Sequence, residues 1–200
     1  MTTDEVRESY RARAGEYIDL LGSIDDTSPV DRALVADWAG AADGPILDVG
    51  CGPGHWTAFL HTAGAEVVGI DPVEAFVEHA ARSYPDVDYR LGRVDDLGVD
   101  EESVGAILAW YSLIHLPPAD LDAALLECAR VLVPGGSLLV GFFEGPDLAP
   151  FDHAVTTAWF WPIPELTRRI EGAGFTVAGT WSRHDDGARP HGAIRATRAG

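Results

Sequence analysis

The chain of 200 residues is long enough to bury a substantial hydrophobic core, and its length suits a single α/β domain over residues 1–200. It carries 14 basic and 32 acidic residues, which gives a net charge of −18. A chain this negative repels a phosphate backbone, so we expect no nucleic-acid partner. No apolar run reaches the roughly 18 residues of a membrane span, and the polar first residues lack the apolar core of a signal peptide. We therefore predict a cytoplasmic protein with no membrane partner.

The composition is also biased in its choice of polar residues. Every basic residue is arginine, and lysine, asparagine and glutamine are absent. This bias is typical of a GC-rich genome, and adaptation to high salt is the alternative explanation. Cys51 and Cys128 do not make a disulfide framework, and the histidines are scattered without an HExxH pattern. We predict no metal site.

The predicted elements begin with two helices. Apolar residues recur at helical spacing over residues 4–21, and a second helix is expected over residues 29–39, with Ser28 as its N-cap and Pro29 at its first position. The chain then alternates short apolar strands with helices. Strands are predicted over residues 45–50, 66–71, 87–92, 104–110 and 137–143, and helices over residues 55–63, 73–83, 119–131 and 165–171.

Two further strands are predicted near the end of the chain, over residues 175–181 and 191–198, with no helix between them. Strands joined in this way pair antiparallel, whereas strand–helix alternation produces a parallel sheet with helices on both faces. The predicted fold is therefore α/β: a doubly wound, seven-stranded, mostly parallel sheet with an antiparallel C-terminal edge pair. Residues 144–164 contain several prolines and aromatic residues and are predicted to form a long functional loop.

Three glycines follow the first strand of the alternating region, in the sequence ILDVGCGPGHW. Gly50, Gly52 and Gly54 permit a sharp turn and a close approach of a ligand to the backbone. The start of the following helix offers unpaired N–H groups that suit a carboxylate or phosphate. A tight strand-to-helix turn alone explains one glycine more readily than three, so the pattern favours a nucleotide-like ligand.

The next strand ends in an acid, Asp71, at about 20 residues after the glycines, where an acid accepts hydrogen bonds from ribose hydroxyls. A plain helix cap is the alternative, because Pro72 follows it. The ribose interpretation is favoured since both features occur in consecutive strand–helix units.

These residues resemble the class I S-adenosylmethionine-dependent methyltransferases, over roughly residues 10–175. The resemblance includes ILDVGCGPG, the strand VVGIDP, the acidic loop after the third strand, ILAWYSLIHL and ARVLVPGGSLLVGFF. It implies a Rossmann-like methyltransferase fold, S-adenosyl-L-methionine as cofactor and S-adenosylhomocysteine as product. It also implies methyl transfer to the oxygen, nitrogen or carbon of a small-molecule acceptor. The acceptor and the oligomeric state stay open.

The resemblance assigns roles around the cofactor. Residues 48–54 would surround its methionine part, residues 71–72 its ribose and adenine, residues 93–96 the adenine rim and residues 109–111 its inner side. Residues 1–40 would form a helical lid, and residues 144–164 would lie on the substrate side. The implied cofactor-binding residues are Tyr10, Tyr17, Asp48, Gly50, Cys51, Gly52, Gly54, Asp71, Pro72, Arg93, Val94, Asp95, Ala109, Trp110 and Tyr111.

One of these positions departs from the family pattern. Relatives usually have an acid where this chain has Arg93, against the amino group of the adenine. Either Asp95 takes over this contact or the backbone of Val94 reads the adenine. In the lid, Tyr10 and Tyr17 are two helical turns apart and would share a face.

His115, soon after the strand over residues 104–110, is predicted as the catalytic base, and His153 is a weaker candidate. A base is needed only if the acceptor is protonated. We expect His115→Ala to reduce turnover and to leave cofactor affinity nearly unchanged. Two other functions stay open. One is an NAD(P)-dependent oxidoreductase, although the chain lacks its GxGxxG spacing, and the other is a non-catalytic S-adenosylmethionine-binding protein.

Overall fold

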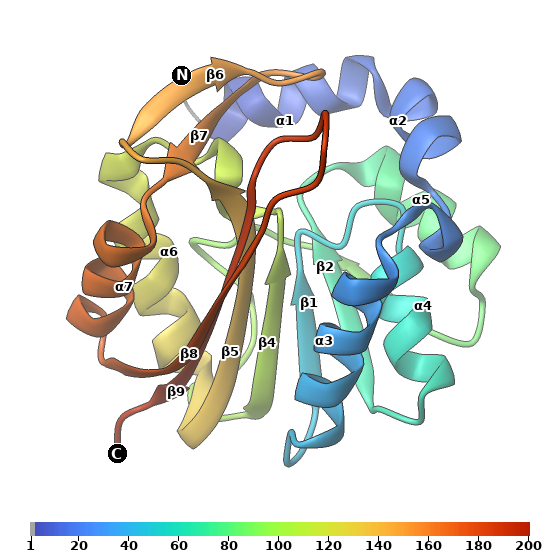
Figure 1. Cartoon of the computed structure of the whole chain (residues 1–200). Coiled ribbons are helices and arrows are strands. Elements are labelled where there is room, and N and C mark those ends of the chain that lie inside the picture. The colour runs from blue at the N-terminus through green and yellow to red at the C-terminus, as the bar shows by residue number, and fades with distance from the viewer. Residues whose placement is uncertain (1–2) are drawn as a thin grey trace.

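The computed structural model describes residues 3–200, so residues 1–2 of the predicted lid segment lie outside the described residues. A nine-stranded sheet carries helices on both faces (Figure 1). The helices are α1 (Thr3–Ala12), α2 (Ala14–Leu21), α3 (Pro29–Gly40), α4 (His55–Thr62), α5 (Glu74–Ser83), α6 (Pro118–Val131) and α7 (Ile163–Gly172), with short 3-10 helices η1 (Ile24–Asp26) and η2 (Leu113–His115). The strands are β1 (Ile46–Val49), β2 (Val67–Asp71), β3 (Asp88–Leu91), β4 (Val104–Trp110), β5 (Leu132–Glu144), β6 (Ala149–Asp152), β7 (Thr157–Trp161), β8 (Phe175–Arg183) and β9 (His191–Arg198).

The sheet reverses its strand order between β1 and β4. Strands β3, β2, β1, β4 and β5 lie side by side in that order and are parallel. Strand β9 runs antiparallel to β5, and β8 runs antiparallel to β9. This confirms the predicted doubly wound, mostly parallel fold with an antiparallel C-terminal pair. In such sheets, ligands bind outside the carboxyl ends of the strands at the point where the order reverses.

Successive residues of the central strands supply the core on opposite faces of the sheet. Leu47 and Val49 of β1 belong to a cluster with side chains of α6 and α7. Ile46 belongs to a second cluster with Trp38 of α3 and Leu60 of α4. Strands β1 and β4 are buried along their whole length, which explains why both read as continuous apolar runs. None of the helices within residues 3–200 is long and apolar enough to cross a membrane.

Two segments differ from the sequence prediction. The helix expected over residues 4–21 is two helices, because the backbone at Arg13 leaves the helical region (φ −120°, ψ 16°). Residues 144–164 are not a plain loop: β6 and β7 form an antiparallel hairpin, and β7 pairs with the end of β5. The sheet therefore has nine strands rather than seven. The proline at position 150 argued against a strand in the sequence, because proline is rare inside sheets. It is tolerated here because β6 is an edge strand.

Candidate functional site

The glycine-rich turn between β1 and α4 packs against the loop that follows β4. Gly50, Gly52 and Gly54 have positive φ angles of 72°, 53° and 88°. A Cβ atom at Gly50 would lie 2.3 Å from the Cβ of Ser112, so a side chain here would force one of the two loops to move. The turn thus places bare backbone at the point where the strand order reverses.

Asp71, the last residue of β2, is hydrogen-bonded to the backbone of this turn. One carboxylate oxygen accepts a hydrogen bond from the backbone N–H of Gly52 (2.9 Å), and the other accepts one from the N–H of Val73 (2.8 Å). Burial raises the pKa of Asp71 to about 6. The carboxylate also lines a cavity, where its remaining lone pairs can accept hydrogen bonds from ligand hydroxyls.

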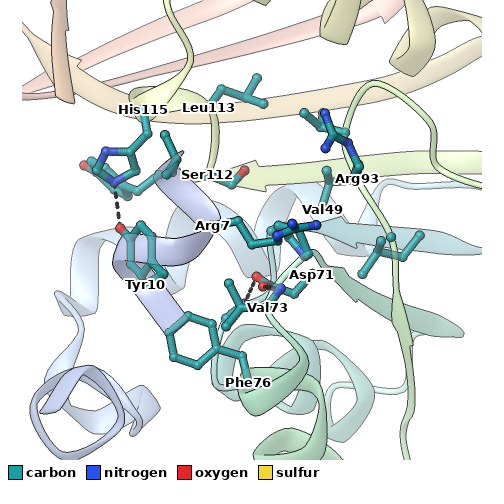
Figure 2. Close-up of a pocket in the computed structure, with 18 of the residues that line it drawn as sticks. Arg7, Tyr10, Val49, Asp71, Val73, Phe76, Arg93, Ser112, Leu113 and His115 are labelled. Carbon is teal, nitrogen blue, oxygen red and sulfur yellow. Dashed lines mark hydrogen bonds between the residues drawn. The ribbon is translucent and has the colours of Figure 1, made fainter. Parts of the chain in front are cut away.

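This first cavity, of about 120 Å³, lies between the strand ends and α1 (Figure 2). Residues that follow β1, β2, β3 and β4 line one side, and Arg7 and Tyr10 of α1 line the other. The rings of Tyr10, Tyr17 and Phe76 pack together, with centroids 5.4 to 5.9 Å apart. The two tyrosines therefore meet despite the break between their helices, and α1 covers the cavity as a lid would.

His115 joins this cover to the β6–β7 hairpin. Its Nδ1 lies 2.8 Å from the carbonyl oxygen of Thr157, and its Nε2 lies 2.6 Å from the hydroxyl of Tyr10, as Figure 2 shows for Tyr10. A carbonyl only accepts, so Nδ1 carries the proton. Burial lowers the pKa of His115 to about 4, which keeps the ring neutral. Nε2 then accepts from Tyr10, and both ring nitrogens are engaged.

A second cavity, of about 350 Å³, adjoins the first and falls in the size range of small-molecule sites. Part of its wall is the glycine-rich turn, and the rest carries aromatic rings, imidazoles and an ion pair. The residues that line both cavities are Tyr10, Tyr17, Gly50, Gly52, Trp110 and Tyr111. Those that line only the second include Asp31, Asp48, Cys51, His55, Trp56, Phe143, His153, Arg183 and His191.

The polar groups of the second cavity are mostly neutral or paired. Arg183 forms an ion pair with Asp31 at 3.0 Å and another with Asp185. The Nδ1 atoms of His55 and His153 are buried and have no hydrogen-bond partner among the described residues. Burial lowers the pKa of His55 to about 4, and it also lowers the pKa of His153. These imidazoles are therefore neutral near pH 7 and available to a ligand.

Asp48 places a buried carboxyl group under the glycine-rich turn. The hydroxyl of Thr57 donates to it at 2.7 Å. Burial raises the pKa of Asp48 to about 7, partly offset by the Thr57 hydrogen bond and reinforced by the nearby charge of Asp71. A cationic ligand group beside this residue would favour its ionised form.

Tyr111, directly after β4, has a strained backbone. Its φ angle of 55° is rare for a bulky residue. Its N–H donates to the carbonyl of Gly141 at 3.0 Å, and its ring contacts those of Trp110, Phe143 and His191. These contacts hold the phenol where the two cavities meet. Strain of this kind persists only where the surroundings fix it, and such residues cluster at functional sites.

Most of the residues that the sequence assigned to the cofactor line one of the two cavities. Arg93 and Val94 line the first, but Asp95 forms an ion pair with Arg93 at 2.9 Å. Within residues 3–200, Asp95, Gly54 and Ala109 are absent from the walls of both cavities. Ala109 lies inside the core, and Gly54 is the N-cap of α4.

Sequence reasoning missed the residues that reach the cavities from distant elements. Asp31 lies in the first turn of α3, and His191 is the first residue of β9. An antiparallel strand begins at the edge where parallel strands end, and His191 accordingly pairs in register with Phe143 near the end of β5. The predicted antiparallel pair therefore contained the signal for His191.

Comparison with known proteins identifies the class. A family model described as a methyltransferase domain matches residues 46–136. A probable S-adenosylmethionine-dependent methyltransferase from Mycolicibacterium smegmatis is 35% identical over 143 residues, which cover 68% of this chain and 53% of that protein. The chain thus spans about half the length of this curated relative. It belongs to the class I S-adenosylmethionine-dependent methyltransferases.

Solved structures share the fold. The 1,6-didemethyltoxoflavin-N1-methyltransferase of Burkholderia thailandensis, solved with 1,6-didemethyltoxoflavin and S-adenosylhomocysteine bound, has a TM-score of 0.81 at 20% identity, covering 98% of this chain and 89% of that one. The cyclase SpnF has a TM-score of 0.82 at 19% identity, covering 99% of this chain and 96% of that one. At these identities the likeness shows the fold alone. Since the fold carries more than one activity, the reaction has to be argued from the site.

The residues present fit S-adenosylmethionine. Gly50, Gly52 and Asp71 line the first cavity, where the two glycines offer backbone and Asp71 offers its carboxylate. The hydroxyl of Ser112 is buried in the wall of the first cavity and has no hydrogen-bond partner within the described part of the chain. Such a group costs free energy unless a ligand satisfies it. No group of three or more metal-ligating side chains occurs within residues 3–200.

Proposed function

We propose that this chain transfers the methyl group of S-adenosylmethionine to a small-molecule acceptor. The observation that carries the proposal is the pair of adjoining cavities at the reversal of strand order. The first cavity, with Asp71, Pro72 and Val94, would hold the adenosine. The part of the second beside Asp48 and Gly52 would hold the methionine, and its remainder would hold the acceptor.

The contribution of the protein to this reaction is alignment and exclusion of water. When bound, the cofactor supplies an electrophilic methyl carbon on a good leaving group. Trp110 and Tyr111 line both cavities and offer aromatic faces to a cationic sulfonium. Tyr10 and Tyr17 close the site from above, which supports the lid assigned to the N-terminal segment.

We propose a holding role for His115 in place of the catalytic base expected from the sequence. Both of its ring nitrogens are hydrogen-bonded, one to Tyr10 and the other to Thr157. His115 therefore cannot remove a proton from the methyl acceptor unless the lid opens. The adenine contact expected of Asp95 is proposed for the backbone of Val94, because Asp95 is paired with Arg93.

The setting of the enzyme is also a proposal. Cys51 and Cys128 are buried free thiols, which supports the reducing environment of the cytoplasm. The net charge of −18 supports a small-molecule substrate rather than nucleic acid.

Calorimetric titration with S-adenosylhomocysteine tests the cofactor site. We expect Asp71→Asn to bind about 10- to 100-fold more weakly than the wild type, because a charged acceptor of hydrogen bonds is lost. Asp86→Asn, an exposed change after α5, is the control and should bind normally. Thermal melts of both variants check that they fold.

Native mass spectrometry of the purified protein separates the alternatives. Co-purified S-adenosylmethionine or S-adenosylhomocysteine would support the proposal. A bound nicotinamide nucleotide, or unchanged affinity of Asp71→Asn, would contradict it. Cofactor binding with no methyl transfer to any of a broad metabolite panel would favour a non-catalytic binding protein.

A further inference from the structure

The second cavity contains a hydrogen-bonded pair whose polar atoms have no role in the proposed binding of the cofactor. The hydroxyl of Tyr111 is hydrogen-bonded to Nδ1 of His191, and both side chains line the cavity. Tyr111 also lines the first cavity, so its phenol stands where the two cavities meet. This is where an acceptor atom must lie to reach a methyl group presented from the cofactor side.

The groups around His191 can carry a proton. Burial and Arg183 lower the pKa of His191, while the carboxylates of Asp31 and Asp185 partly offset this. The ring is therefore neutral at rest and able to accept a proton, and two carboxylates lie close enough to favour the resulting cation. Tyr111 is hydrogen-bonded to His191 from the end of β4. The charges that act on the imidazole come from Asp31 of α3, Arg183 of β8 and Asp185 of the loop after β8.

The cavity also indicates the kind of acceptor. Its walls include the rings of Trp56, Trp110 and Phe143, which suit a planar aromatic molecule. The one arginine in its wall, Arg183, is already paired with Asp31 and Asp185. The imidazoles of His55 and His153 are neutral. An anionic acceptor would need an unpaired cationic side chain, and the residues that line this cavity include none. We therefore expect the acceptor to bind in its neutral form.

A neutral hydroxyl is a weak nucleophile and must lose its proton as it is methylated. We propose that the acceptor is an aromatic hydroxyl compound, that Tyr111 contacts the reacting oxygen, and that Tyr111 and His191 together remove its proton. This inference rests on the proposed methyl-transfer function and names the acceptor class and the proton acceptor of that same site.

The atoms balance as follows in one turnover. The acceptor oxygen bonds to the methyl carbon while the carbon–sulfur bond breaks, and the electron pair of that bond stays on sulfur. The acceptor proton passes to the oxygen of Tyr111, and the original phenolic proton of Tyr111 passes to Nδ1 of His191. The imidazolium then loses a proton to solvent. His55 and His153 lack this arrangement, since their Nδ1 atoms have no hydrogen-bond partner within the described residues.

The test uses three probes of similar size with the 200-residue protein and S-adenosylmethionine. Naphthol is protonated at pH 8, para-nitrophenol is largely ionised, and naphthylamine is a neutral amine that attacks without prior loss of a proton. We expect the wild type to methylate naphthol. Tyr111→Phe and His191→Gln should each lower kcat for naphthol about 100-fold, the lower end of the usual range for general-base catalysis. Both should lower kcat for para-nitrophenol only a few-fold, because that acceptor needs no base.

A pH profile distinguishes proton removal from a merely structural role. Between pH 7 and 9, the wild-type kcat for naphthol should be flat, because His191 is already neutral. In His191→Gln, kcat should rise about tenfold per pH unit, because only the ionised acceptor then reacts. His184→Gln, an exposed histidine of the same segment, is the matched control and should behave like the wild type.

Each outcome decides the matter. Equal losses on naphthol and para-nitrophenol, or a flat profile in His191→Gln, would overturn the proton relay. Methylation of naphthylamine but of neither hydroxyl compound, or of none of the probes by a protein that binds S-adenosylhomocysteine, would overturn the acceptor class and leave the cofactor site standing. Failure to bind S-adenosylhomocysteine at all would instead defeat the proposed function. If His191→Gln loses S-adenosylhomocysteine binding, His191→Asn takes its place in the test.

Discussion

Folding buries the carboxyl group of Asp48, and burial makes the ionised form of this group unfavourable. It is only 2% exposed, and its pKa rises to about 7 from an ordinary value of 3.8. Because the folded state holds the proton more tightly, the stability of the protein is unaffected below about pH 4, falls as the pH rises from 4 to 7, and stays lower above pH 7. The hydrogen bond from Thr57 recovers part of this loss.

We therefore predict that Asp48→Asn stabilises the ligand-free protein at pH 8. The amide is neutral and can still accept from Thr57, so the gain should be on the order of 1–2 kcal/mol, or about 3–6 °C in Tm. The gain should shrink as the pH approaches 4, where the wild-type carboxyl is protonated. Asp43→Asn, at an exposed position, is the control. Thermal melts that show no gain at pH 8, or a gain independent of pH, would refute the account.

At the scale of single residues, the sequence singled out cavity-lining residues at the strand ends and missed several that reach the cavities from distant elements. Gly50 and Asp71 are the last residues of two predicted strands, so the rule for parallel sheets places both at the edge where the cavities lie. Asp31 and His191 reach the second cavity through α3 and β9, and their placement depends on how distant elements pack. The partners of His115 illustrate the same limit, since Tyr10 lies 105 residues away and Thr157 in an unpredicted hairpin.

At the scale of elements, Tyr10 connects the lid to the rest of the site. It packs on Tyr17 and Phe76 and donates to His115. His115 in turn is hydrogen-bonded to the carbonyl of Thr157 in β7, so its imidazole joins the lid to the hairpin. Arg13, at the break between α1 and α2, adds a contact to the carbonyl of Ala154. The lid and the hairpin are therefore expected to open together.

We predict that Tyr10→Phe speeds the release of S-adenosylhomocysteine about fivefold, because one hydrogen bond contributes about 1 kcal/mol. His115→Ala should speed release at least as much, in contrast to the unchanged affinity expected from sequence alone. Stopped-flow displacement measures both rates. Thr62→Ala removes an exposed hydroxyl that lies outside both cavities and donates to Ala58 within α4, so it should leave release unchanged. Normal release from both Tyr10→Phe and His115→Ala, with turnover lost only in His115→Ala, would instead support His115 as the catalytic base.

The hairpin shows why some elements could not be predicted. Strands β6 and β7 are short and lie at the end of the sheet, and β6 contains Pro150. What stabilises them is distant: β7 pairs with Phe143 and Glu144 of β5, and Trp161 is buried in the main core. Local propensity is weak there and tertiary packing decides. Strands β1 and β4 are buried along their whole length, so their continuous apolar sequences identify them without knowledge of a distant partner.

At the scale of the whole molecule, the excess of acid dominates. Several of the described ion pairs are exposed and lie within one helix turn, such as Arg82 with Glu78 and Arg11 with Glu8, and pairs of this kind contribute little. The net charge of −18 is spread over a small domain, so repulsion among carboxylates opposes the compact state. The pair of Arg183 and Asp31 is partly buried, with side chains 20% and 15% exposed, so salt screens it less than the exposed pairs.

Salt should therefore stabilise this protein, and the size of the effect separates the two explanations of its composition. If the bias reflects codon usage, the fold should persist at about 20 mM NaCl, and its Tm should rise by a few degrees, on the order of 3–5 °C, at about 500 mM as screening shortens the range of repulsion. KCl should act equally, because screening does not depend on the cation. If the bias reflects adaptation to high salt, the protein should lose its cooperative melt at low salt and recover it only in concentrated salt. A Tm that falls with added NaCl would contradict both explanations, because attraction between exposed pairs would then outweigh the net repulsion.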